Sequence, residues 1–173
     1  MYKEGERMKV VKDKEFLNKP CKEVRVWDEK EMAHANKVIT HIKTFLIQYK
    51  EQAVGVASNQ LGYDVRIFGA RINNVIKIYI NPVIHTYQHS GRYPSVESCL
   101  SCKERNIRIS RDNKIFLNHD VLIDGKRTSI SEKYEGYNAS IIQHEVDHLD
   151  GILIIDSTRK IHSVIAKKRI NNK

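Results

Sequence analysis

The sequence predicts an α+β domain, because a long amphipathic helix is followed by many short strands and then by a second helix. The helical segment 30–49 repeats apolar residues every three or four positions, whereas the middle of the chain carries short β-branched and aromatic runs. The 173 residues suffice for one domain with a sizeable core. We therefore expect a single domain over 1–173, with 1–7 as an extension and 158–173 as a basic C-terminal helix or tail.

The first predicted helix is a packing element. No Pro or Gly interrupts it, and its apolar stripe consists of Met32, Ala35, Val38, Ile39, Ile42, Phe45 and Leu46. We assign it no chemistry. The segment 53–62 that follows is rich in small residues and has two glycines, which predicts a loop where backbone comes close to another group.

Short β-type segments come next in the chain. The predicted strands are 65–68, 75–80, 83–87, 106–109, 115–123 and 128–131. Asp124-Gly125 between the last two is a hairpin turn signal. Gly136 then precedes a second helix from about Tyr137 to Asp150, which Gly151 ends.

Composition argues against several protein classes. No apolar run approaches the roughly 18 residues of a membrane span, and the segment 1–16 alternates charges without an apolar signal core. Three cysteines do not make a disulfide framework, so we expect the reducing cytoplasm. The net charge of +9 is dispersed except in the tail 159–173, and most of it is expected to be solvated surface.

The clearest chemical signal is the run QHEVDH at 143–148. His144 and His148 stand four apart, so both imidazoles project from one face of a helix and can ligate one metal ion. Glu145 can reach a water at that ion without taking a coordination position. The pattern predicts a metal-dependent hydrolase, and two structural histidines on an amphipathic helix are the alternative.

A hydrolytic site of this kind needs a third protein ligand. Ile154 stands where a metzincin has histidine, and no glutamate follows Glu145, which excludes the two common downstream arrangements. Asp156 and His162 are possible downstream ligands without a supporting context. The better candidate is Cys99, upstream in a short segment flanked by polar residues.

The other two cysteines allow different interpretations. Cys102 lies three residues after Cys99, so the pair could join the histidines in a closed structural zinc site. Cys21 is expected to be an inert structural cysteine.

Three segments together resemble the peptide deformylase family. The chain reads AVGVASNQ at 53–60, ESCLS at 97–101 and QHEVDH at 143–148. The family has G-φ-G-φ-A-A-x-Q (φ apolar), E-G-C-L-S and Q-H-E-x-D-H in the same order and at matching separations. The resemblance covers about 8–157, and it implies antiparallel β-sheets around a central metal-binding helix.

The resemblance implies a hydrolase that removes the N-formyl group from N-formylmethionyl nascent peptides. One divalent metal ion would be held by the Cys99, His144 and His148 side chains. Iron(II) is favoured in the cell, with zinc or nickel in purified protein, since a thiolate with two imidazoles suits these ions. Glu145 would transfer the proton. The Gln60 side-chain amide and the Leu100 N–H would stabilise charge on the formyl oxygen.

The same resemblance places further residues around the centre. Substrate contacts are predicted for Val54, Gly55, Arg105, Ser140 and Ile141. Glu97 and Asp147 are expected behind the metal ligands, with Arg111 as the partner of Asp147. The basic tail suits docking on the ribosome or plain solvation, and a monomer is expected.

Three residues depart from the family pattern. Ala53 and Ser98 replace glycines, and Ser58 replaces an alanine. These changes support a second hypothesis, a metal-binding homologue with altered or lost activity. A third is a basic ribosome- or RNA-associated protein with a structural zinc. Glu145 and Gln60 favour the enzyme over both, because a structural metal site needs neither.

Overall fold

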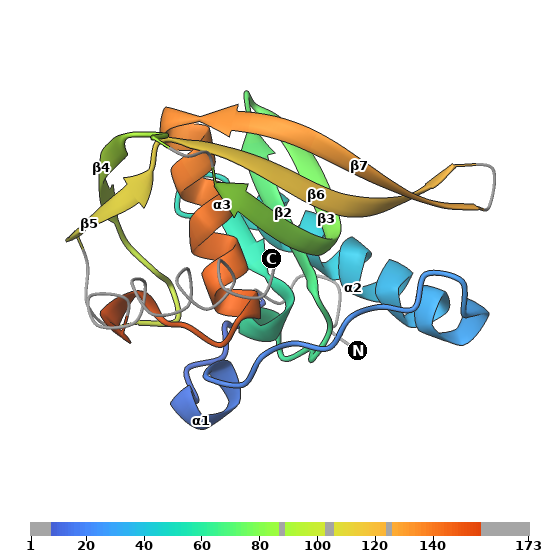
Figure 1. Ribbon diagram of the computed structural model, residues 1–173. Helices are drawn as coiled ribbons and strands as arrows, with labels where there is room; N and C mark the ends of the chain where they lie inside the picture. The colour runs from blue at the N-terminus through green and yellow to red at the C-terminus, as the bar shows by residue number, and fades with distance from the viewer. Residues whose placement is uncertain (1–7, 87–88, 103–105, 124–125, 157–173) are drawn as a thin grey trace.

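The computed structural model, drawn in Figure 1, describes residues 8–86, 89–102, 106–123 and 126–156. Its elements, in order, are α1 (Lys14–Leu17), α2 (Glu29–Gln48), β1 (Gly55–Ala57), the 3-10 helix η1 (Ser58–Leu61), β2 (Ile67–Ile72), β3 (Val75–Thr86), β4 (Arg92–Glu97), β5 (Ile107–Asp112), β6 (Lys114–Ile123), β7 (Lys126–Glu135) and α3 (Gly136–Leu149). The predicted α+β class is confirmed.

Two antiparallel sheets surround α3. The larger has the strand order β1-β2-β3-β6-β7, and the smaller pairs β4 with β5. In Figure 1, α3 lies between the larger sheet and the β4–β5 pair, while α2 covers the opposite face of the larger sheet. The expected arrangement of antiparallel sheets around a central helix is therefore present.

Strand alternation creates one apolar core on each face of the larger sheet. Ile67 on β2 pairs with Ile80 on β3, and both face the core under α2. The next pair, Phe68 and Tyr79, faces the core under α3, where the two rings stack with centroids 4.6 Å apart. Successive side chains of a strand point to opposite faces, so these two strands serve both cores.

The apolar stripe of α2 packs as predicted. Asp28 caps the helix by accepting hydrogen bonds from the backbone N–H groups of Lys30 and Glu31. The side chains of Val38, Ile42, Phe45 and others of the stripe are buried against the sheet. Among the described residues, α2 contributes none of the three candidate metal donors.

The prediction of a loop over 53–62 is wrong for 55–61, whereas the predicted close approach of backbone to another group occurs at Gly55, where an added Cβ would lie 2.4 Å from Oε1 of Glu145. Residues 55–57 form an edge strand that pairs with 68–70 of β2, and η1 follows directly. Small residues do not by themselves favour a strand, so this one depends on its pairing with β2.

The central strands also differ from prediction. The runs 75–80 and 83–86 belong to one strand, β3, whose register shifts between Ile80 and Val83, and residue 87 of the second predicted strand lies outside the described residues. Asn81 sits at this irregularity with a positive φ of 50°. Strand β4 was not predicted, because it contains Pro94 and few apolar residues; an edge of a two-stranded sheet tolerates proline.

Glycine ends α3 as predicted. Gly151 follows the helix with φ +71°, and a Cβ there would lie 2.6 Å from the carbonyl oxygen of Asn18. The position therefore needs glycine both for its conformation and for its space.

Several predicted features fall partly or wholly outside the described residues: the extension 1–7, the turn at 124–125 and the tail 158–173. The strands on either side of the turn pair antiparallel, with Ile123 opposite Lys126. Among the described helices, none is both long and apolar enough to cross a membrane.

Candidate metal centre

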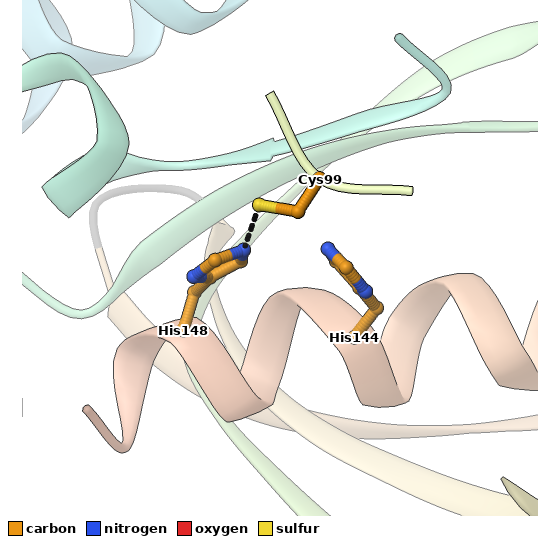
Figure 2. A group of neighbouring side chains, drawn as sticks. All are labelled: Cys99, His144 and His148. Carbon is orange, nitrogen blue, oxygen red and sulfur yellow. Dashed lines mark hydrogen bonds between the residues drawn. The ribbon is translucent and has the colours of Figure 1, made fainter. Parts of the chain in front are cut away.

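Three predicted ligands meet at the centre of the molecule. The Cys99 thiol and one donor nitrogen from each of His144 and His148 lie within 4.8 Å of one another. Figure 2 shows both rings projecting from the same side of α3 toward the thiol. The Cys99 Sγ is 3.2 Å from Nε2 of His148. Cys102 is not part of this group, so the described residues do not support a closed four-ligand site.

Two of the three donors come from α3, and the third comes from the segment after β4. His144 and His148 are one helical turn apart on α3, and their ring centroids are 4.9 Å apart. Cys99 comes two residues after the end of β4, the strand that packs beside α3. A soft thiolate and two imidazoles form a donor set that suits zinc, iron(II), cobalt or nickel.

A carboxylate fixes the orientation of the first histidine. Oε2 of Glu97 lies 2.9 Å from Nδ1 of His144, which leaves Nε2 of that ring to face the thiol. Arg111 holds the same carboxylate through two hydrogen bonds, of 2.9 and 2.8 Å. Burial would raise the pKa of Glu97, but the hydrogen bonds with Arg111 and His144 outweigh it and lower that pKa to about 2.

Arg111 also reaches across to the helix. Its Nη1 donates to the Asp147 carboxylate, so the predicted contact between these residues is confirmed. The guanidinium is only 3% exposed and thus neutralises two carboxylates in a largely dry region. Glu97, expected behind the predicted metal ligands, contacts one of them, because its carboxylate lies between Arg111 and His144.

The pKa values of the three donors depart from their ordinary range. The hydrogen bond with Cys102 and burial raise the pKa of the Cys99 thiol. Burial and the neighbouring His144 lower the pKa of His148. For His144 burial acts downward, but the hydrogen bond with Glu97 prevails and the pKa rises. Ligation needs the thiolate and neutral imidazoles, so metal binding would release protons.

Glu145 lies beside the donors with an oxygen that is free to act. Its side chain is buried, and Oε2 has no hydrogen-bond partner among the described residues. Burial, first of all, raises the pKa of Glu145 to about 7. A Cβ added to Gly55 would lie 2.4 Å from Oε1, so that glycine gives the carboxylate its space. A buried acid without a hydrogen-bond partner, next to a thiol and two imidazoles, fits a site that takes a metal ion and water.

Gln60 projects from η1 with its amide turned toward the thiol. Its Oε1 accepts a hydrogen bond of 3.0 Å from the backbone N–H of Ala57. Its Nε2 lies 3.5 Å from the Cys99 Sγ and 3.2 Å from the Ser101 Oγ. The fixed acceptor side orients the N–H₂ group toward the centre.

A cavity of about 140 Å³ opens beside these groups. Among the predicted substrate contacts, its lining includes Val54, Gly55, Ser140 and Ile141, and it also includes Leu100. Arg105 lies outside the described residues. Asp156 is not part of the metal group and accepts a hydrogen bond from Asn18, and His162 lies outside the described residues.

Two residues that anchor the end of α3 were not predicted. The Asn59 side chain donates to the backbone carbonyl of His148 at 2.6 Å, and Arg66 pairs with Asp150 at 2.6 Å. Neither contact has a local sequence signal, because each joins residues more than 80 positions apart.

Cys21 is buried as expected, and burial raises its pKa to about 11.

Comparison with known proteins shows the family to which the chain is similar. The model of the polypeptide deformylase family matches residues 7–164. A peptide deformylase of Thermotoga neapolitana is 30% identical over 89% of this chain and 88% of its own length. Peptide deformylase 1 of Clostridium perfringens is 36% identical over 83% of this chain and 92% of its own length.

A solved structure agrees with these sequence matches. The crystal structure of peptide deformylase from Thermotoga maritima superimposes with a TM-score of 0.72 at 32% identity. The match covers 87% of this chain and 95% of that one. The family model and the solved structure therefore both match most of the chain.

Proposed function

The chain belongs to the polypeptide deformylase family, and we propose that its clustered thiol and imidazoles form the metal site for the deformylase reaction. The protein is a metal-dependent hydrolase that removes the N-formyl group from N-formylmethionyl nascent peptides. One observation carries the residue assignment: Cys99, His144, Glu145 and Gln60 line one cavity, and the His148 donor lies within 4.8 Å of those of Cys99 and His144.

The metal ligands in this proposal are Cys99, His144 and His148. When bound, the divalent ion supplies a Lewis acid, which lowers the pKa of water and polarises the formyl carbonyl. We propose iron(II) as the ion in the cell and zinc or nickel as ions that purified protein can carry, since the donor set suits all three.

Glu145 is proposed as the proton carrier. It would take a proton from the attacking water and deliver it to the amine nitrogen of the peptide as the bond from that nitrogen to the formyl carbon breaks. The unpartnered Oε2 and a pKa raised to about 7 support this role, because a base works best with a pKa near the working pH. The products are formate and a peptide with a free amino terminus.

Gln60 and Leu100 are proposed to stabilise the formyl oxygen as it gains negative charge. Gln60 would donate from Nε2, whose direction is set by the bond from the Ala57 N–H to its Oε1. Leu100 would donate from its backbone N–H, and it borders the same cavity. One such donor is typically worth about 2.7–4 kcal/mol of barrier.

Val54, Gly55 and Ile141 are proposed to hold the substrate, because they line the cavity beside Glu145. Behind the centre, Glu97 would keep the His144 ring in one tautomer.

The remaining assignments extend the proposal to the whole chain. We propose one domain over 1–173 that acts as a monomer in the cytoplasm, where nascent peptides are formed. The basic tail 158–173 would dock on the ribosome through its positive charge.

The test is formate release from formyl-Met-Ala-Ser under anaerobic conditions by the iron-, nickel- and zinc-loaded protein. Turnover by at least one metal form is expected. Stoichiometric metal binding with no turnover in any form would contradict the proposed activity and favour an altered homologue.

Changing Glu145 to Gln tests the assigned proton carrier. The variant should lose at least roughly 10²-fold in kcat while metal stoichiometry stays at the wild-type value. Metal content is measured by atomic absorption on the same sample. A variant that loses its metal, or keeps its kcat, would show that Glu145 has another role.

A further inference from the structure

The wall of the cavity beside the metal donors carries two serines. Ser95 lies on β4 and Ser140 on α3, and both are buried and line the cavity. They share it with apolar side chains, among them Ile141, and with the half-exposed Tyr137 at its rim. A pocket built only for an apolar side chain has no need of hydroxyl groups in its wall, because covering them without partners costs free energy.

The strand geometry accounts for the position of Ser95. Glu97 on β4 faces α3, where it contacts His144. Ser95 lies two residues earlier and therefore on the same face of the strand. Val96 between them points to the other side and is 64% exposed, whereas Ser95 is 6% exposed. Ser95 thus faces α3, and the cavity reaches it there.

The two hydroxyl groups are not equivalent. The Ser140 Oγ donates to the backbone carbonyl of Tyr137 at 2.8 Å, a bond within its own helix. The Ser140 hydroxyl hydrogen is therefore already engaged in a hydrogen bond, and the hydroxyl can act toward a ligand only as an acceptor. The Ser95 hydroxyl makes no hydrogen bond to any residue that the structure describes, so its hydrogen is available to a bound ligand.

We propose that Ser95 is a specificity-determining residue, whose hydroxyl donates to a hydrogen-bond acceptor in the first side chain of the formylated peptide. This inference rests on the proposed function. A methionine thioether is a weak acceptor, and the oxygen of methionine sulfoxide is a stronger one. Norleucine has nearly the same shape and no acceptor, so it leaves the hydroxyl covered and unpaired. The favoured substrates therefore have an unbranched side chain with an acceptor at or on the sulfur position.

The experiment compares kcat/KM for three peptides: formyl-Met-Ala-Ser, its sulfoxide, and formyl-norleucine-Ala-Ser. The wild-type enzyme should prefer both methionine forms over norleucine by about tenfold, the size of one weak hydrogen bond plus an avoided unpaired group. Ser95→Ala should bring the methionine-to-norleucine ratio to about one and lower kcat/KM for the sulfoxide most. Each ratio is measured within one preparation, so a partly folded variant does not distort it.

Ser140→Ala is the matched control. It removes a hydroxyl from the same wall, but this hydroxyl already donates to the Tyr137 carbonyl within the helix. Because Ser140 borders the cavity, kcat/KM should change by the same factor for all three peptides, and the ratios among them should stay at the wild-type values. Equal changes of the ratios in both variants would overturn the assignment to Ser95 in favour of general polarity. Ratios that Ser95→Ala leaves unchanged would also overturn it, while hydrolysis of formyl-Met-Ala-Ser would leave the proposed function standing. No hydrolysis of any peptide would overturn both.

Discussion

Two buried arginines hold α3 in different ways. Arg111 pairs with the carboxylates of Glu97 and Asp147, and Glu97 in turn contacts the His144 ring. Arg66 donates to the Pro82 carbonyl at 2.9 and 3.1 Å and pairs with Asp150 after the end of the helix. Arg111 therefore neutralises two carboxylates behind the proposed metal ligands, whereas Arg66 donates to backbone carbonyls and pairs with Asp150 after the helix end. Arg111 thus acts on the orientation of a proposed metal ligand, whereas Arg66 acts only on the stability of the fold.

The largest effect is expected from Arg111→Met. The change leaves two poorly exposed carboxylates without a counter-charge, and breaking such a pair typically costs about 3–5 kcal/mol. His144 would lose the fixed orientation of its Glu97 partner, so metal affinity should fall with stability. Urea unfolding and metal titration measure the two effects.

Arg111→Lys provides the control for that experiment. It keeps the charge but not the two-pronged contact with Glu97, so it should recover part of the stability and less of the metal affinity. Wild-type metal affinity in the Met variant would contradict the role of this arginine in orienting His144.

A smaller effect is expected from Arg66→Met. The Pro82 carbonyl loses its donor, while Asp150 is 25% exposed and can turn to water. The loss of stability should be about 1–3 kcal/mol, with metal stoichiometry and kcat close to wild type. Thermal unfolding and formate release, measured on the same preparation, provide the check. A fall in kcat as large as that of Arg111→Met would remove the distinction between the two arginines.

Gly55→Ala probes the opposite side of α3, and its effect on stability should be the smallest. The new methyl group would meet Oε1, Cδ and Cγ of the buried Glu145 side chain at 2.4, 2.8 and 2.9 Å, so that whole side chain would have to shift. We expect kcat to fall about tenfold because the carboxylate is displaced, with metal content unchanged and a stability loss near 1 kcal/mol. Steady-state kinetics with formyl-Met-Ala-Ser measures the change, and wild-type kcat would mean that Glu145 has room to spare.

The fold was predicted where a segment is informative by itself. The helix of 30–49 and the helix around QHEVDH appear within a residue or two, because their apolar and capping signals are local. The sequence predicts a loop where β1 lies, since the pairing of β1 with β2 depends on residues outside β1 itself. Pro94 hid β4 for a similar reason: only its edge position makes proline acceptable.

The site shows the same division. The spacing of His144, Glu145 and His148 predicts their roles, the lack of a downstream ligand makes Cys99 the better third candidate, and resemblance to a family points to Gln60. Nothing in the sequence indicated that Glu97 would contact His144 rather than Gln60. The free hydroxyl of Ser95 was likewise invisible, because it depends on which face of β4 meets α3.

By itself, the sequence determined that two imidazoles and a carboxylate share one helix, since a spacing of four residues sets the face on which side chains lie. The partners that contact these groups depend on the tertiary structure. Cys99 comes to within 3.2 Å of His148 across a separation of 49 residues, and Arg111 finds Asp147 across 36. Such contacts follow from the packing of α3 between two sheets, and no local period in the chain encodes that packing.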